Sequence, residues 1–132
     1  MTREEFIKVL DDKGYSYEIK GDKIVVTSRG GIDLNSITSL PEGVIFDNRT
    51  YVLLNAIKSL PSEIEFRNSG DVFLDSLISI TPGVEFRTWT HPRMDYLFNG
   101  WFYNWKNNIN GIHHNRLLNK MIADGIFDKE RK

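Results

Sequence analysis

Histidine is the side chain best suited to metal binding or acid–base chemistry near neutral pH, and the chain contains three, at positions 91, 113 and 114. Neutral imidazoles bind Zn²⁺ and related metals, so His113 and His114 could anchor a metal-dependent nuclease. Adjacent positions of an α-helix point about 100° apart, so these two can face one metal only if a helix begins after them. We interpret them as polar residues at a helix start and expect no metal site and no cofactor; the nuclease is the alternative.

Carboxylates are the second candidates for acid–base chemistry. Glu65 and Glu85 lie 20 residues apart, and in a repeat of that length they would stack at about 4.8 Å. Glu63 could approach them from the next coil, and Asp33 and Asp75 could approach each other in the same way. No His, Lys or metal ligand joins them there, and we find no Gly-rich phosphate loop, Ser-centred elbow or HExxH pair. We therefore interpret these carboxylates as a solvated acidic face and predict that the protein is not an enzyme.

A repeat must position these side chains. Residues 32–86 match themselves when shifted by 20 residues, and each main apolar column stays apolar in all three copies. Pro41 and Pro61 share a column, whereas Pro82 comes one residue late, which predicts a local change at that corner. The apolar columns are Ile32, Val52 and Val72; Leu34, Leu54 and Leu74; Ile37, Ile57 and Leu77; Leu40, Leu60 and Ile80; Val44, Ile64 and Val84; and Phe46, Phe66 and Phe86.

One 20-residue unit cannot bury its own apolar side chains, but stacked units share a continuous core. Alternating pairs such as Val44 with Phe46 predict short strands, and the Asp, Asn, Gly and Ser between them predict turns. The pattern therefore predicts a small parallel β-solenoid of about three repeats, in which equivalent residues of successive coils lie side by side.

The segment from Ile37 to Val44, Ile-Thr-Ser-Leu-Pro-Glu-Gly-Val, resembles the short leucine-rich-like repeats of bacteriophage and bacterial proteins. The resemblance covers residues 32–86. It implies a phage-like origin, and it makes a leucine-rich-repeat horseshoe the alternative fold. The step from Leu34 to Ile37 is shorter than the corresponding step of the usual leucine-rich repeat, which favours the solenoid.

The residues before the repeat predict a cap. Thr2 and Glu5 form a capping-box pattern, Gly14 is placed to end the helix, and Gly21-Asp22 suits a two-residue hairpin turn. The second hairpin strand, around Ile24 and Val26, lies one repeat before Val44 and Phe46. We expect it to form the first rung of the solenoid.

The residues after the repeat predict a helical cap. Thr90 and Pro92 suggest a helix start, followed by an amphipathic stripe, and a second helix ends at Gly125. We predict one α+β domain, 1–132, with an N-terminal helix and hairpin (1–31), the repeats (32–88) and the C-terminal helical cap (89–132). The stripe contains Met94, Leu97, Phe98, Trp101, Phe102 and Trp105, and we expect Phe98, Trp101 and Phe102 to join the core.

Charge and composition limit the partners. The 132 residues carry a net charge of −1 and include no cysteine. A near-neutral total argues against direct nucleic-acid binding, and the apolar runs are too short to cross a membrane. Without cysteines nothing calls for an oxidising compartment, so we expect a cytoplasmic protein, in the host cytoplasm if it is phage-encoded. Residues 32–88 hold four basic and eight acidic side chains, and residues 89–132 hold seven basic and four acidic ones.

This acidic middle favours function by binding. We expect a non-catalytic protein-interaction module whose partner is a basic, nucleic-acid-binding protein, for example a host defence protein such as a CRISPR effector. A structural or self-assembling virion component, and hence a homo-oligomer, is a further alternative. The expected partner-binding residues are the acidic side chains and the aromatic residues beside the stripe: Asp33, Glu63, Glu65, Asp71, Asp75, Glu85, Trp89, Tyr96 and Tyr103.

Overall fold

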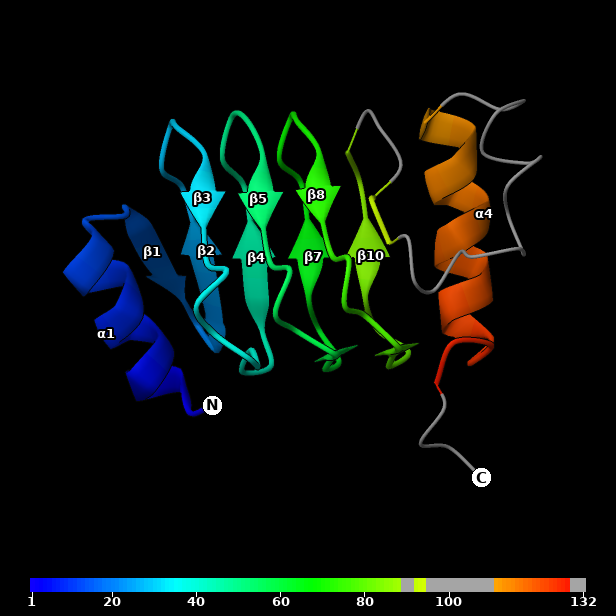
Figure 1. Cartoon of the computed structure of the whole chain (residues 1–132), viewed down its shortest axis with the longest axis horizontal. Coiled ribbons are helices and arrows are strands. Elements are labelled where there is room, and N and C mark those ends of the chain that lie inside the picture. Colours follow the sequence, from blue (N-terminus) through cyan, green and yellow to red (C-terminus); the bar gives the residue numbers. More distant parts are fainter. Residues whose placement is uncertain (89–91, 95–110, 129–132) are drawn as a thin grey trace.

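The computed structural model describes residues 1–88, 92–94 and 111–128, with the side chains of 111–114 left out. Figure 1 shows a row of stacked coils with α1 near one end and α4 at the other. The helices and strands are α1 (Arg3–Lys13), β1 (Tyr17–Lys20), β2 (Lys23–Val26), β3 (Ile32–Asp33), β4 (Val44–Phe46), β5 (Val52–Leu53), β6 (Ser59–Leu60), β7 (Glu65–Phe66), β8 (Val72–Phe73), β9 (Ser79–Ile80), β10 (Glu85–Phe86) and α4 (Gly111–Ala123).

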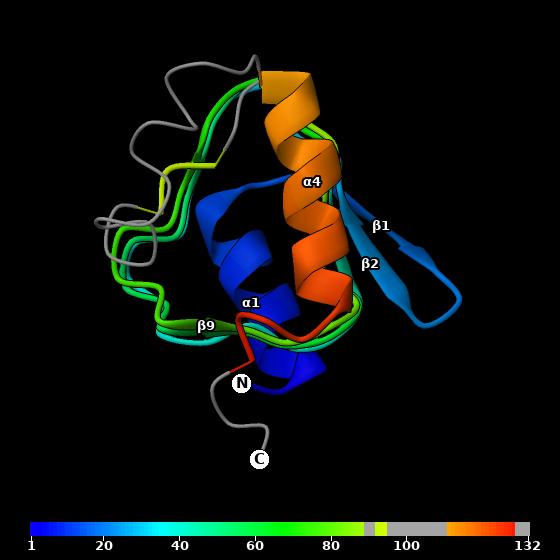
Figure 2. The same cartoon turned by 90° about the vertical axis from the view of Figure 1, so that its right-hand side faces the viewer.

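The strands form three sheets that run along the stack. The five-stranded sheet has the order β1-β2-β4-β7-β10, the three-stranded sheet β3-β5-β8, and the two-stranded sheet β6-β9. Only β1 and β2 are antiparallel; every other strand pair is parallel and joins residues 20 apart, such as Phe46 with Phe66 and Val52 with Val72. The β-solenoid prediction is confirmed. Successive coils superimpose when viewed along the stack (Figure 2).

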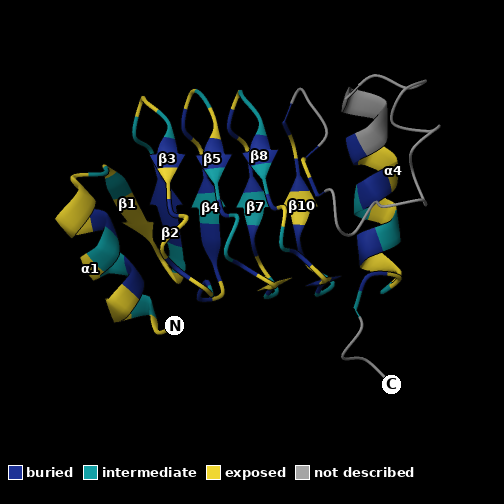
Figure 3. Ribbon diagram, viewed as in Figure 1, coloured by how far each residue is buried: buried dark blue, intermediate teal, exposed yellow. Residues whose placement is uncertain are grey.

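The predicted columns form the core. All their members are buried, and Figure 3 shows buried residues on every strand from β2 to β8. The rings of Phe46, Phe66 and Phe86 stack with centroids 5.2 and 4.9 Å apart and planes within 7° of parallel. The identical positions in successive coils therefore pack face to face, as the repeat pattern requires.

A buried amide column supports one corner of the coils. The side-chain amide of Asn68, which is fully buried, donates to the carbonyl of Thr50 at 2.9 Å and to that of Gly70 at 3.0 Å. Asn48 makes the equivalent bonds one coil earlier. The amides thus pair backbone carbonyls where the chain turns and no sheet can form.

A second corner requires a left-handed backbone in every coil. Gly43, Glu63 and Gly83 share a column and have φ values of 81°, 62° and 103°. The late proline changes this corner only locally: Thr81 keeps an N–H, which donates to the carbonyl of Leu60 at 3.0 Å. The following strands keep their 20-residue register.

The N-terminal predictions are confirmed. Thr2 and Glu5 form a reciprocal capping box, and Gly14 ends α1 with a φ of 73°. The β1–β2 hairpin turns at residues 21–22, and Ile24 and Val26 pair with Val44 and Phe46 as the first rung.

The C-terminal prediction is correct for α4 and wrong for residues 92–94. Arg93 forms a parallel bridge with Phe73, and Met94 is buried one coil beyond Leu74. This segment therefore begins a fourth coil instead of a helix. Positions 97, 98, 101, 102 and 105 of the expected stripe lie outside the described residues. Within the described ranges, no helix has the length and hydropathy to cross a bilayer.

Candidate interaction surfaces

The acidic residues expected to bind a partner divide between two faces of the solenoid. Glu63, Glu65 and Glu85 lie on the outer surface of the five-stranded sheet or at its corner, whereas Asp33, Asp71 and Asp75 lie on or beside the three-stranded sheet. The structure therefore does not place them on one surface. The three aromatic candidates, Trp89, Tyr96 and Tyr103, lie outside the described residues.

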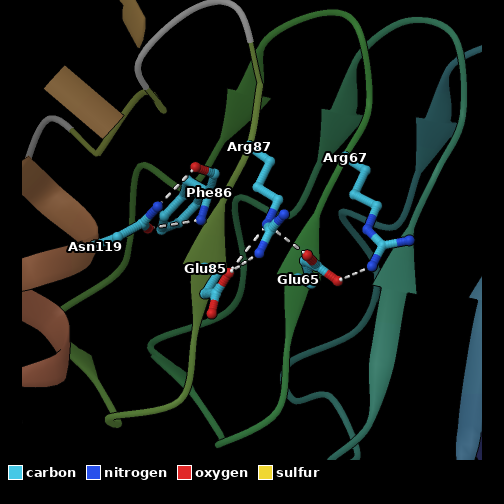
Figure 4. Close-up of polar contacts among 6 residues, drawn as sticks. All are labelled: Glu65, Arg67, Glu85, Phe86, Arg87 and Asn119. Carbon is cyan, nitrogen blue, oxygen red and sulfur yellow. Dashed lines mark hydrogen bonds and ion pairs between the residues drawn. The ribbon is translucent and has the colours of Figure 1, made fainter. Parts of the chain in front are cut away.

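An ion-pair ladder covers the five-stranded sheet. Glu65 lies beside Glu85 in the parallel register, and arginines separate the two charges (Figure 4). One oxygen of Glu65 lies 2.8 Å from Nη2 of Arg67, and the other lies 2.8 Å from Nε of Arg87. The Arg87 Nη2 group also donates to Glu85 at 2.9 Å. The hydrogen bond to Glu85, together with the charge of Glu65, raises the pKa of Arg87.

Burial makes Glu65 the centre of this ladder. Its side chain is 16% exposed, against 49% for Glu85 and 59% for Arg87. The ladder borders a shallow depression of about 330 Å³, at whose edge Lys23 contacts Glu63 at 2.9 Å. The carboxylates on this face are thus engaged by basic side chains of the same chain.

The three-stranded sheet presents a different surface, which we call the apolar row. In the parallel register Asp33 lies beside Leu53, Leu53 beside Phe73, and Phe73 beside Arg93. Leu53 and Phe73 are partly exposed, and the outer members are exposed and oppositely charged. The guanidinium carbon of Arg93 lies 5.2 Å from the centroid of the Phe73 ring.

Tyr51 extends the apolar row. Its side chain is 41% exposed, and its ring lies so close to Gly31 that any side chain at position 31 would overlap it. Gly31 therefore provides the flat backbone on which the ring rests. Arg93 contacts Asp71 at 3.3 Å beside the row.

A polar ladder runs beside the apolar row. The backbone N–H of Asn55 donates to the side-chain oxygen of Asn35 at 2.9 Å, and that of Asp75 donates to Asn55 at 3.1 Å. Asp33 is linked to this ladder through the N–H of Asn35. These bonds fix the spacing of the polar side chains that border the row.

The last coil is closed by side chains of α4. Asn119 pairs with the backbone of Phe86, and the amide of Asn115 donates to the carbonyl of Thr88 at 2.8 Å. Beside these contacts lies a groove of about 640 Å³ that Arg87 and Arg116 also line. The sequence analysis did not identify these residues.

No histidine cluster emerges. His91 lies outside the described residues, while positions 113 and 114 both fall within α4. The helix therefore does not begin after them, which was the condition for a shared metal. Among the described residues, no group of three or more His, Asp or Glu side chains could hold a metal ion.

Comparisons with protein-family models, with curated proteins and with solved structures find no match for this chain. The function must therefore be argued from the surfaces themselves.

Proposed function

We propose that this protein acts by binding another protein, and that the apolar row of the three-stranded sheet is its binding surface. The observation that carries the proposal is the order of side chains along that row. Two partly exposed apolar residues, Leu53 and Phe73, lie between Asp33 at one end and Arg93 at the other.

This arrangement has the composition of a protein interface. Interfaces bury aromatic and aliphatic side chains at their centre and keep charged side chains at their rim. Phe73 and Tyr51 provide large contact area with little conformational entropy to lose. The charges of opposite sign at the two ends orient the partner along the row.

The ion-pair ladder is less suited to be the primary contact. A partner that paired with Glu65 would have to displace Arg67 or Arg87, each of which lies 2.8 Å from it. Exchanging one ion pair for another yields little net free energy. We therefore assign the ladder mainly to the stability of the five-stranded face.

The chemistry of the surface defines the partner. Asp33 and Asp75 are exposed on this side of the molecule, and they favour a basic contact next to an apolar patch. A basic, nucleic-acid-binding protein has that chemistry. The further proposal that it is a host defence protein rests on the resemblance of the repeats to those of phage proteins.

Affinity capture from a bacterial lysate, followed by titration of the purified partner, tests the proposal. Phe73→Ser and Asp33→Lys should each weaken binding about tenfold or more. Ile78→Ser is the matched control for Phe73→Ser, because Ile78 is an apolar residue, 41% exposed, next to the two-stranded sheet. Equal loss of binding in the Ile78 and Phe73 variants would contradict the proposal.

A further inference from the structure

The solenoid is closed at one end and carries an open strand edge at the other. In the last coil, Asn119 covers β10, the carbonyl of Phe127 accepts from the N–H of Ile80 in β9, and Arg93 pairs with β8. At the opposite end, β1 is the outermost strand of the five-stranded sheet. Exposed strand edges readily pair with another strand, so this asymmetry needs an explanation.

The hydrogen bonds of β2 show which way its backbone faces. The N–H of Ile24 donates to the carbonyl of Gly43 at 2.9 Å, and the N–H of Asp47 donates to the carbonyl of Val26 at 2.8 Å. Residues 24 and 26 therefore turn their backbone groups toward β4. The residues that alternate with them turn theirs toward β1.

The same alternation determines which groups of β1 face outward. Thr27 donates to the carbonyl of Ser16 at 2.9 Å, so the even-numbered residues of β1 bond to β2. Tyr17 and Ile19 consequently direct their N–H and C=O groups away from the sheet. Among the described residues, none pairs with the outward backbone groups of Ile19.

The side chains around this edge are complementary to themselves. Ile19 is 49% exposed, an unusual state for an isoleucine in a strand. It lies between Glu18 and Lys20, whose side chains are 57% and 66% exposed and whose charged groups lie 3.4 Å apart.

We infer that the protein forms a twofold dimer in which the β1 strands of two copies pair antiparallel, with Ile19 opposite Ile19 of the second copy. In this register Glu18 faces Lys20 of the second copy, and Lys20 faces Glu18. Centring the pairing on position 18 would place two glutamates opposite each other, and centring it on position 20 would place two lysines there. Like charges in directly opposite positions destabilise strand pairing, so only the register centred on Ile19 is favoured.

This pairing satisfies both features of the edge. The outward N–H and C=O of Ile19 exchange hydrogen bonds with those of the second copy, and the two isoleucine side chains cover each other. The two five-stranded sheets become one continuous sheet across the twofold axis. The apolar rows stay on a separate sheet, so the dimer is independent of the proposed function.

Sedimentation equilibrium over about 1 to 100 μM protein tests the inference. The wild-type chain should associate to twice 15.3 kDa. Glu18→Lys and Lys20→Glu should each weaken the dimer roughly tenfold, and the double variant should recover wild-type association to within about threefold. Ile19→Lys should be monomeric, because it places two cations on the twofold axis.

Glu42→Lys is the matched control: it makes the same charge change at an exposed position outside β1 and should dimerise normally. Circular dichroism confirms that each variant is folded. A wild-type chain that stays monomeric at every concentration overturns the inference. Dimers that persist unchanged in the Glu18, Lys20 and Ile19 variants overturn it equally, because the copies would then meet elsewhere.

Discussion

Asn119 of α4 takes the place that a further strand would occupy beside Phe86. Its side-chain oxygen accepts the N–H of Phe86 at 2.7 Å, and its side-chain nitrogen donates to the carbonyl of Phe86 at 2.9 Å (Figure 4). A carboxamide has the same donor and acceptor as a peptide group. One side chain therefore satisfies both backbone groups that β10 would otherwise leave open.

Asn119→Ala should lower the free energy of unfolding by about 1 to 3 kcal/mol, because it leaves the partly buried N–H and C=O of Phe86 without partners. Urea denaturation measures the loss. Asn119→Asp should be no better than alanine, since a carboxylate cannot donate to the carbonyl. Lys120→Ala, at the next and exposed position of α4, should change stability by less than about 0.5 kcal/mol. An equal loss in both alanine variants would contradict the assigned role.

Phe66→Ala should cost about 3 to 5 kcal/mol, because it empties the middle of the three-ring stack in the core. Phe66→Leu should cost less, since it keeps most of the buried volume. Thermal unfolding followed by circular dichroism gives the comparison. An unchanged melting temperature for the alanine variant would be incompatible with the stacked coils.

Glu63→Gly should be more stable than Glu63→Ala by about 1 kcal/mol. Position 63 has a φ of 62°, which strains any residue with a Cβ, and glycine occupies the same corner at positions 43 and 83. Both variants lose the contact with Lys23, so the difference between them isolates the backbone strain. The reverse change, Gly83→Ala, should be destabilising. Urea midpoints that do not separate the glycine and alanine variants would refute this account of the corner.

Glu5 should make stability fall at acidic pH. Hydrogen bonds from the backbone and the side chain of Thr2 lower the pKa of Glu5 in the folded chain from its ordinary value of 4.5. The folded state therefore favours the carboxylate, and this contribution is present above the ordinary pKa and is lost as the pH falls through the lowered value. Glu5→Gln keeps an acceptor without the charge. The stability difference between wild type and Glu5→Gln should be larger at about pH 7 than at about pH 3. A difference that does not change with pH would show that the charge contributes nothing.

The sequence predicted the solenoid because each column repeats its residue type at a fixed interval. It did not predict which acidic residues share a face, since the apolar pattern leaves the angles of the corners undefined. Asp33 and Glu65 therefore seemed equivalent, although they lie on different sheets. Arg67 and Arg87 shared a column from the start, but only the structure shows that both reach Glu65.

The fourth coil was missed because two patterns claimed the same residues. Met94 lies 20 residues after Leu74, yet it also fits the period of an amphipathic helix, and Pro92 suits a helix start. The pairing of Asn119 with Phe86 spans 33 residues and leaves no periodic signal. Contacts of this kind arise from where the helix docks, and no local pattern encodes them.

The superposition of successive coils has a consequence for how such a chain can change in evolution. Duplication of one whole 20-residue unit would add about 4.8 Å to the stack and keep every interior side chain in its column. The structures at both ends would meet the same backbone groups as before. Insertion of a single residue would instead move all later side chains of a strand from the interior to the surface. Variation in length is therefore quantised, and the unit of inheritance is the coil.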